Sequence, residues 1–418
     1  MKRFLFFLLG ALCLFTGQAQ LRPTPDQLGS IYHAYPAPGN DVTYTVAPDG
    51  YKPFYISHYG RHGSRWRTAD EHYLQVVDVF DSLYQCRQLT PLGEDVRLRL
   101  HRVWEDARGC SGNITPIGER QHHDIAARMY GHYPEVFQDS SVIDARSSTS
   151  LRCALSMSYF TEALKERNPA LRVSRRAYTK YMDYIAHTSP EAETFCAAGQ
   201  WTNGFSRFQS KLIRPERLMK SLFTCPQHFT PEQSKALMTG LYWIAVDLQN
   251  CDLPGLTLYD IFQYEELYDL WRTVNARMYV CNAASPLNGG LMPRQAIPLV
   301  RNIVESADHA IRTGNHAADL RFGHDTHLIR LLALMEVEGC ANRETDFEKM
   351  HLAWQDYHVS PMGANLQLIF FRNATGQVLV KLLLNEHEVR IPALTSAQGS
   401  YYEWETLKKY LLSRTKDL

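Results

Sequence analysis

The 418-residue sequence has no hydrophobic run of membrane-spanning length, because its apolar stretch at residues 4–15 is shorter than the roughly 20 residues that a spanning helix needs. An excess of one charge is also missing, since 44 basic residues are matched by 44 acidic ones. Internal repeats and low-complexity linkers are absent as well. These absences argue against a membrane anchor and against a solenoid. Affinity for a polyanion must come from a local cluster of charges.

Paired cysteine motifs are lacking too, because the nine cysteines include no Cys-x-x-Cys spacing, which argues against a structural zinc site. Eight cysteines remain beyond the N-terminal segment that contains Cys13: Cys86, Cys110, Cys153, Cys196, Cys225, Cys251, Cys281 and Cys340. An even number permits disulfides in an exported chain, and buried free thiols are the alternative. The sequence does not determine which cysteines would pair.

The N-terminal segment has the organisation of a secretory signal peptide. Lys2 and Arg3 precede the apolar run, and Gly17-Gln18-Ala19 places small residues at the positions that determine cleavage. We expect residues 1–19 to be removed and the mature protein to be secreted or periplasmic, with no membrane contact after cleavage. Loss of Lys2 and Arg3 from the 44 basic residues leaves 42 against 44 acidic ones, a charge near −2 with neutral histidines.

Strand patterns occur near both ends of the remaining chain. Phe54-Tyr55-Ile56-Ser57-His58 is an apolar, aromatic-rich run typical of a buried strand. Residues 319–322, 365–371 and 378–384 show β-rich patterns, and the last two runs are separated by the turn-rich segment 373–376.

The middle third is helical in pattern. Thr230 is placed to cap a helix, with proline at the first helical position and Gln233 completing a capping box. Further helices are predicted over residues 258–276 and 294–312, the second ending at Gly314.

The alternation of these patterns predicts an α/β fold of about two domains. We expect an α/β core with a mostly parallel sheet, built from residues 20–160 and 310–418. A mainly helical cap is expected from residues 161–309. Ligands of open α/β sheets bind at the carboxyl ends of the strands, so side chains that follow the predicted strands are candidate site residues.

The segment Arg61-His62-Gly63-Ser64-Arg65 follows the first predicted strand and combines a nucleophile with two fixed cations. A neutral imidazole attacks phosphorus, and guanidinium groups remain charged and bind phosphate oxygens bidentately. Gly63 allows a close approach of the backbone to a ligand. Arg67 adds another cation nearby. The alternative is a basic turn at the surface.

A second motif, Phe322-Gly323-His324-Asp325-Thr326-His327, precedes residues with helical spacing. His324 and Asp325 are thus expected at a helix N-terminus, where free backbone N–H groups favour anions. His324 can donate a hydrogen bond to phosphate, and Asp325 can protonate a leaving oxygen. Asp325 or Thr326 acting only as a helix cap is the alternative, and a metal site at His324 and His327 lacks a third ligand.

A third segment contributes Arg146 and Arg152. Arg152 is followed by Ser156 and Phe160 at helical spacing, so it is a candidate third guanidinium at the start of a helix. Taken by themselves, Arg146 and Arg152 are more often surface charges than ligands.

These three segments, in this order, resemble the histidine acid phosphatase family, the branch of the histidine phosphatase superfamily that includes phytases. The resemblance implies that His62 is the nucleophile and forms a phosphohistidine, while Asp325 is the proton donor. It also implies that Arg61, Arg65, Arg152 and His324 bind the phosphoryl group. No metal and no cofactor are needed, because the arginines supply the positive charge.

Within the family, Ser148–Cys153 and the run from Phe322 to Met335 are most similar to multiple inositol polyphosphate phosphatases. Two features depart from common patterns. That subgroup usually carries His-Ala-Glu where this chain has His324-Asp325-Thr326, and many members carry proline at the position of Arg67.

The resemblance implies a secreted phosphomonoesterase whose partner is a small phosphate ester, most of all an inositol polyphosphate such as phytate. A broad-specificity acid phosphatase or sugar phosphatase is the alternative, and a catalytically inactive phosphate-binding protein is the alternative of another class. Four further cations would either line a basic pocket under the cap or be solvated surface charges. They are Arg67, Arg175, Arg176 and Lys180. No nucleic-acid partner is expected, and the oligomeric state is not determined.

Overall fold

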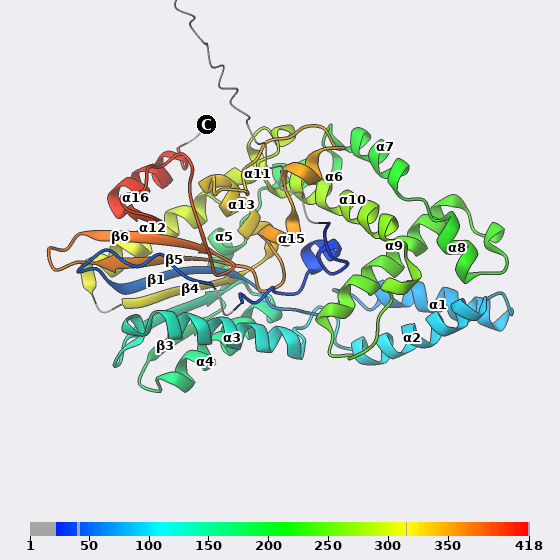
Figure 1. Ribbon diagram of the computed structural model, residues 1–418, viewed down its shortest axis with the longest axis horizontal. Helices are drawn as coiled ribbons and strands as arrows, with labels where there is room; N and C mark the ends of the chain where they lie inside the picture. Colours follow the sequence, from blue (N-terminus) through cyan, green and yellow to red (C-terminus); the bar gives the residue numbers. More distant parts are fainter. Residues whose placement is uncertain (1–21, 40–41, 315, 417–418) are drawn as a thin grey trace, which may run out of the picture.

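The computed structural model describes residues 22–39, 42–314 and 316–416 (Figure 1). The predicted signal peptide, residues 1–19, lies outside the described residues. One mixed sheet forms the centre of the α/β core, with strand order β3-β2-β4-β1-β5-β6-β7 and β8 paired to β6. The strands are β1 (Lys52–Arg61), β2 (Val142–Ser147), β3 (Arg172–Arg176), β4 (His316–Gly323), β5 (Asn365–Arg372), β6 (Val378–Leu384), β7 (His387–Val389) and β8 (Tyr401–Glu403).

The strands nearest the predicted motifs pair in parallel, as expected: β1 with β4, β4 with β2, and β2 with β3. β5, β6, β7 and β8 add antiparallel pairings on the other side of β1. β1, β4, β5 and β6 are buried along most of their length, which explains why their sequences read as nearly continuous apolar runs. The strand predictions at both chain ends are confirmed.

Helices cover both faces of the sheet (Figure 1). α3 (Pro116–His132) and α4 (Leu151–Arg167) pack on one face. α12 (Ile297–Thr313), α13 (Asp325–Met335) and α16 (Trp404–Ser413) lie against the other.

A separate helical lobe occupies the right of Figure 1, and its core is formed by α1 (Glu71–Gln85), α2 (Pro91–Ala107), α8 (Glu216–Leu222) and α9 (Pro231–Asp247). α1 packs on α9, and α2 packs on α8. The remaining helices are α5 (Met182–Ile185), α6 (Pro190–Ala198), α7 (Thr202–Leu212), α10 (Tyr264–Asn282), α11 (Leu291–Arg294), α14 (Met350–Ala353) and α15 (Asp356–Val359).

Local capping chemistry sets several boundaries. The Thr230 hydroxyl accepts from Gln233 N–H at 3.2 Å while the Gln233 side chain accepts from Thr230 N–H at 2.8 Å, so the predicted capping box is confirmed. α12 ends at Gly314, which adopts the left-handed conformation with φ 71°. α10 begins and ends about six residues later than predicted, because its apolar face continues into residues 279–281.

The elements are distributed differently from the predicted division into core and cap. α1 and α2 belong to the helical lobe although they lie within residues 20–160, since their apolar faces pack on α9 and α8. β3 belongs to the sheet although it lies within residues 161–309. α12 begins within that range and packs on β1 and β4 of the sheet. No helix among the described residues combines the length and apolarity needed to cross a membrane.

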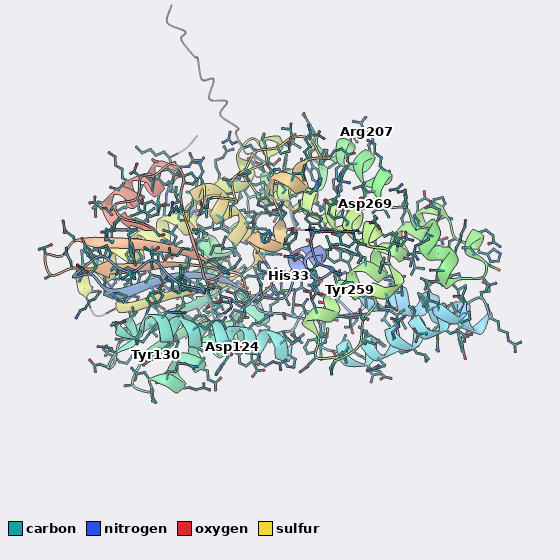
Figure 2. All side chains as sticks on the ribbon, in the orientation of Figure 1. His33, Asp124, Tyr130, Arg207, Tyr259 and Asp269 are labelled. Atoms are coloured by element: carbon teal, nitrogen blue, oxygen red, sulfur yellow. The ribbon has the colours of Figure 1, made fainter. Side chains whose placement is uncertain are left out.

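A short segment joins the two parts. The 3₁₀ helix at Gln27–Tyr32 packs on α9, α10 and α15. His33 and Tyr259, labelled near the middle of the molecule in Figure 2, both contact the Gln249 side chain just after α9, at 3.2 Å and 3.3 Å. The end of α9 is therefore tied to the chain that enters the sheet.

Candidate active site

The two histidine motifs meet because β1 and β4 are neighbouring parallel strands. Arg61 pairs with Gly323 in the register, so the residues that follow them, His62 and His324, emerge side by side at the carboxyl end of the sheet. His62 N–H donates to the Gly323 carbonyl at 3.1 Å. The two imidazole centroids are 5.7 Å apart, so the two predicted motifs lie side by side in the fold.

His62 is held in one tautomer. Its Nδ1 lies 2.8 Å from the Gly63 carbonyl oxygen, and a carbonyl only accepts, so Nδ1 carries the hydrogen. Nε2 then keeps its lone pair and is the nucleophilic atom. Burial lowers the pKa of His62 well below its ordinary value, and the Arg61 and Arg65 charges lower it further. The imidazole is therefore neutral at physiological pH.

We expected Gly63 to let the backbone approach a ligand closely, but in the structure Gly63 lets the loop approach the backbone of α3 closely. A Cβ at Gly63 would lie 2.6 Å from the Gly118 carbonyl oxygen and 2.8 Å from Gly118 Cα. A Cβ at Gly118, in the first turn of α3, would lie 2.2 Å from the Ser64 carbonyl oxygen. The two glycines thus let the nucleophile loop pack directly on the backbone of α3. Thr115 caps that turn by accepting from Gly118 N–H at 3.3 Å.

Arg61 is fully buried, and part of its guanidinium group is hydrogen-bonded within the protein. Its Nη1 donates to the Ile31 and Ser360 carbonyls at 2.6 Å and 2.7 Å. Within the described chain, Nε and Nη2 have no hydrogen-bond partner, and Nη2 lies 3.5 Å from Asp325 Oδ2. Burial lowers the pKa of Arg61 to about 10, so the guanidinium still carries its charge at neutral pH.

Arg65 and Arg152 complete a group of cations around His62. Both lower the pKa of His62 electrostatically. Arg65 Nη1 donates to the Tyr32 hydroxyl at 3.1 Å, whereas the buried Nε atoms of Arg65 and Arg152 find no acceptor among the described residues. Buried guanidinium N–H groups without acceptors are costly unless an anion binds there.

His324 and Asp325 lie at the start of α13, as predicted. Burial lowers the pKa of His324 to about 4, so its neutral ring can donate one hydrogen bond. Asp325 Oδ1 accepts from Thr326 N–H at 2.8 Å. Burial raises the pKa of Asp325, but the Arg61 charge and the hydrogen bond from Thr326 N–H act in the opposite direction, and the net shift is downward.

Arg67 lies next to this group rather than within it. The side chain is 6% exposed, and its Nε and Nη1 find no hydrogen-bond partner within the described chain. The guanidinium sits 5.7 Å from the Trp243 ring of α9. Its backbone carbonyl accepts from Gly112 N–H at 2.7 Å. Arg67 thus offers a free cation on the side of the site that faces the helical lobe.

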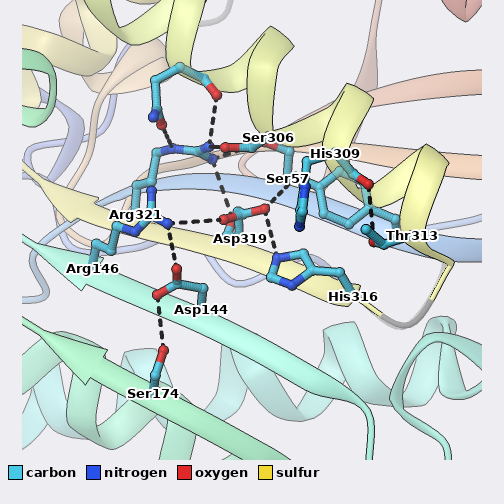
Figure 3. Close-up of polar contacts among 12 residues, drawn as sticks. Ser57, Asp144, Arg146, Ser174, Ser306, His309, Thr313, His316, Asp319 and Arg321 are labelled. Atoms are coloured by element: carbon cyan, nitrogen blue, oxygen red, sulfur yellow. Dashed lines mark hydrogen bonds and ion pairs between the residues drawn. The ribbon is translucent and has the colours of Figure 1, made fainter.

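Arg146, Arg175 and Arg176 are not brought to the catalytic group. Arg146 forms an ion pair with Asp144 on the α12 side of the sheet (Figure 3). Arg176 forms an ion pair with the same carboxylate at 3.1 Å. Arg175 donates to the Thr161 hydroxyl at 2.6 Å. The expected basic pocket under a helical cap is therefore wrong for Arg175 and Arg176, because both lie in β3, the edge strand that the sequence patterns missed.

The polar face in Figure 3 forms the floor of a cavity of about 780 Å³ between β2, β3, β4 and α12. Several of its charges are paired: Asp144 with Arg146, and His316 with Asp319 at 2.9 Å. The residues that line it include neither His62 nor His324. This cavity is thus separate from the histidine pair.

His327 makes a hydrogen bond within the protein in place of binding a metal ion. Its Nε2 lies 3.1 Å from the His187 carbonyl. No group of three or more histidine, cysteine or acidic side chains in the described part of the chain is arranged to hold a metal ion. All eight described cysteines have free thiols.

Several contacts that shape the site were not predicted. Gly63 N–H donates to the Ser156 hydroxyl at 3.2 Å, and Ser64 N–H donates to the Gln121 side chain at 2.8 Å. Ser148 Oγ lies 3.3 Å from His324 Nε2. The helical spacing of Ser156 after Arg152 is a sequence signal that could have indicated its contact with the loop. No pattern in the sequence indicates the contact of Gln121.

Taken together, the fold and site define an α/β protein with a neutral histidine among buried arginines at the carboxyl ends of two parallel strands. A profile of the histidine phosphatase superfamily (branch 2) matches residues 104–385. The chain therefore belongs to that superfamily branch. The matched range contains Arg152, His324 and Asp325, while His62 precedes it.

Solved structures support the same fold. A Bifidobacterium longum multiple inositol polyphosphate phosphatase in complex with inositol hexasulfate aligns with a TM-score of 0.78 at 18% identity, covering 94% of this chain and 99% of that chain. The phytase from D. castellii aligns at 0.66 and 16% identity, covering 93% and 85%. The Hafnia alvei phytase aligns at 0.58 and 13% identity, covering 89% and 98%. No curated protein sequence gives a significant match.

Proposed function

We propose that this protein is a phosphomonoesterase that acts through a phosphohistidine on His62. The observation that carries the proposal is a neutral, buried imidazole surrounded by guanidinium nitrogens without acceptors. Such an arrangement is costly in a resting protein and is compensated when a phosphoryl group binds. Membership in the histidine phosphatase superfamily supports the assignment.

In the first step, His62 Nε2 attacks phosphorus in line with the leaving oxygen. Arg61, Arg65, Arg152 and His324 bind the equatorial oxygens, where negative charge is held through the transition state. The fixed Nδ1–H contact to the Gly63 carbonyl keeps the ring oriented for attack. Water then cleaves the phosphohistidine and regenerates the imidazole.

Asp325 protonates the leaving alkoxide. In the free protein its pKa lies below the ordinary value because the Arg61 charge and the Thr326 N–H act against the effect of burial. A bound dianionic phosphoryl group shares the Arg61 charge, which raises the pKa of Asp325 and lets it carry a proton. Turnover is therefore expected to be fastest at acidic pH.

We assign inositol polyphosphates such as phytate as the substrate class. Arg61, Arg65 and Arg152 account for one phosphoryl group, and the unpartnered, buried Arg67 is available for a second phosphate on the same ligand. A structural neighbour was solved with inositol hexasulfate, which adds support. Residues 1–19 support secretion or export to the periplasm.

The role of Asp325 is tested by leaving-group dependence. An inositol alkoxide leaves only after protonation, whereas nitrophenolate leaves readily without it. Asp325→Asn should therefore slow single-turnover phosphorylation by phytate far more than by nitrophenyl phosphate. His324→Ala should slow both, because it removes a contact to the transferred group. Equal slowing of both substrates by Asp325→Asn would leave Asp325 as a helix cap only.

The substrate class is tested at Arg67. Arg67→Ala should raise KM for phytate about tenfold, the effect of one lost hydrogen bond to a charged group, with little change for nitrophenyl phosphate. Arg207→Ala is the matched control, because Arg207 is exposed on α7, far from the sheet (Figure 2). If Arg67→Ala affects both substrates alike, the protein is a broad-specificity acid phosphatase.

A further inference from the structure

The loop that carries Arg65 and Arg67 is held by the carboxyl end of α9. Asp247, the last residue of α9, is 1% exposed, and Asn250, three residues later, is fully buried. Asn250 Oδ1 accepts from the Ser64 hydroxyl at 2.6 Å, and Asn250 Nδ2 donates to the Tyr32 carbonyl at 2.8 Å. One end of the loop is thereby fixed.

The other end is fixed through Tyr73 of α1. Its hydroxyl accepts from Arg67 N–H at 2.9 Å and donates to Asp247 Oδ2 at 3.2 Å. Asp247 Oδ1 accepts from Asn250 Nδ2 at 3.4 Å. The carboxylate of Asp247 thus lies at the centre of a buried network that reaches both ends of the loop.

The charge of Asp247 acts on the same two arginines without occupying them. Arg65 and Arg67 each lower the pKa of Asp247 electrostatically. Yet the Nε atoms of both arginines and Nη1 of Arg67 are buried and have no hydrogen-bond partner in the described chain. These N–H groups are therefore available to an external anion, while the nearby negative charge of Asp247 partly offsets the attraction of the two arginines for it.

We propose that Asp247 is a positioning residue that orients the Arg65–Arg67 loop and sets how strongly these arginines attract polyanionic phosphate esters. The inference rests on the proposed function and deepens it, since it names the residue that controls substrate affinity. Asp247 does not touch the substrate; it acts through Arg65, through Arg67 and through the hydroxyl of Tyr73.

The proposal predicts a pH dependence with a definite sign. Burial raises the pKa of Asp247 to about 6, despite the opposing arginines. Below that pH the carboxyl is neutral and the site has one more net positive charge, so anions bind more tightly. Above it the carboxylate forms and binding weakens. Removing a unit charge from a buried cluster changes anion affinity by about tenfold.

Other groups around Asp247 do not titrate in the same way. Burial raises the pKa of Tyr73, Cys251 and Tyr259, so these remain neutral between pH 5 and 7.5. His72 faces Arg67 from α1, and burial lowers its pKa, so it needs a control. Among the described residues, the charged and titratable groups around this network are Arg65, Arg67, His72, Tyr73, Cys251 and Tyr259, together with Tyr32 and Asp106.

The test is calorimetric titration of myo-inositol hexasulfate between pH 5 and 7.5, since sulfate esters keep a constant charge there. The dissociation constant of the wild type should rise about tenfold with a midpoint near pH 6. Asp247→Asn should remove this dependence. Tyr73→Phe should shift the midpoint upward, because the Tyr73 hydrogen bond lowers the pKa of Asp247.

Two control variants separate this effect from others. Asp356 is fully buried with a pKa that burial raises to about 6, but it bonds Ser30 and Trp271 instead. Asp356→Asn and His72→Gln should both keep the pH dependence of the wild type. An unchanged dependence in Asp247→Asn, or an unshifted midpoint in a folded Tyr73→Phe, overturns the inference. If the wild type hydrolyses nitrophenyl phosphate but does not bind hexasulfate, the inference fails while the phosphatase proposal stands.

Discussion

Replacing Gly63 by alanine tests whether the packing of the nucleophile loop on α3 is what places His62. The added Cβ would lie 2.6 Å from the Gly118 carbonyl oxygen and 2.8 Å from Gly118 Cα. Both are backbone atoms, so no side-chain rotation relieves the contact. Either the loop or the first turn of α3 must move.

The size of the effect follows from these distances. Overpacking a tight contact costs about 1–3 kcal/mol of unfolding free energy. A shift of the loop by about 1 Å displaces the neighbouring imidazole, and a misplacement of that size costs on the order of 100-fold in rate. Gly63→Ala should therefore lower kcat about 100-fold and lower the melting temperature measurably.

Nitrophenyl phosphate turnover and thermal melting are the assays, and Gly131→Ala is the matched control. Gly131 lies in the same helix, and a Cβ there would meet nothing within 4 Å. Gly131→Ala should keep wild-type kcat and stabilise α3 by up to about 0.5–1 kcal/mol. Wild-type kcat and melting temperature in Gly63→Ala would refute the reasoning.

Three further predictions concern the nucleophile, the absence of a metal requirement and a buried ion pair. His62→Ala should reduce turnover to background in a protein with unchanged circular dichroism, and a folded variant with a tenth of wild-type activity would remove His62 from its role. Activity should survive excess EDTA while vanadate inhibits competitively; activity lost to chelation and restored by one divalent ion would contradict this. Burial raises the pKa of Asp319, but the hydrogen bond from His316 and the charge of Arg321 lower it more, so the pKa of Asp319 is about 2. The ion pairs of Asp319 thus stabilise the fold above about pH 4, and this contribution is lost as the pH falls through 2. Asp319→Asn should therefore lower the free energy of unfolding at pH 7 by about 2 kcal/mol, as measured by urea denaturation.

The central strands were predictable because burial on both faces leaves a continuous apolar pattern, as in β1. His62 and His324 were predictable as partners because each directly follows such a strand. β3 was missed since an edge strand buries little, and three of its five residues are arginines. Its Arg175 and Arg176 therefore looked like loop or cap charges.

Asp247 and Asn250 were beyond the reach of sequence patterns. In α9 the apolar spacing of Leu237, Leu241 and Ile244 marks one buried face. Polar residues at the end of such a helix normally face solvent. The sequence around Asp247 and Asn250 contains no pattern that indicates that the nucleophile loop packs on them. Their role depends on tertiary contacts between segments almost 200 residues apart, such as Ser64 with Asn250.

The position of β3 also affects how copies of this protein meet. It is the last strand on its side of the sheet in the described chain, so one row of its backbone N–H and C=O groups is open to pairing with a strand from another molecule. Arg172 and Arg175 place like charges in that strand, while the charge of Arg176 is paired with Asp144, so two such edges would repel each other. Arg172 and Arg175 would thus keep the sheet from growing between molecules at high concentration.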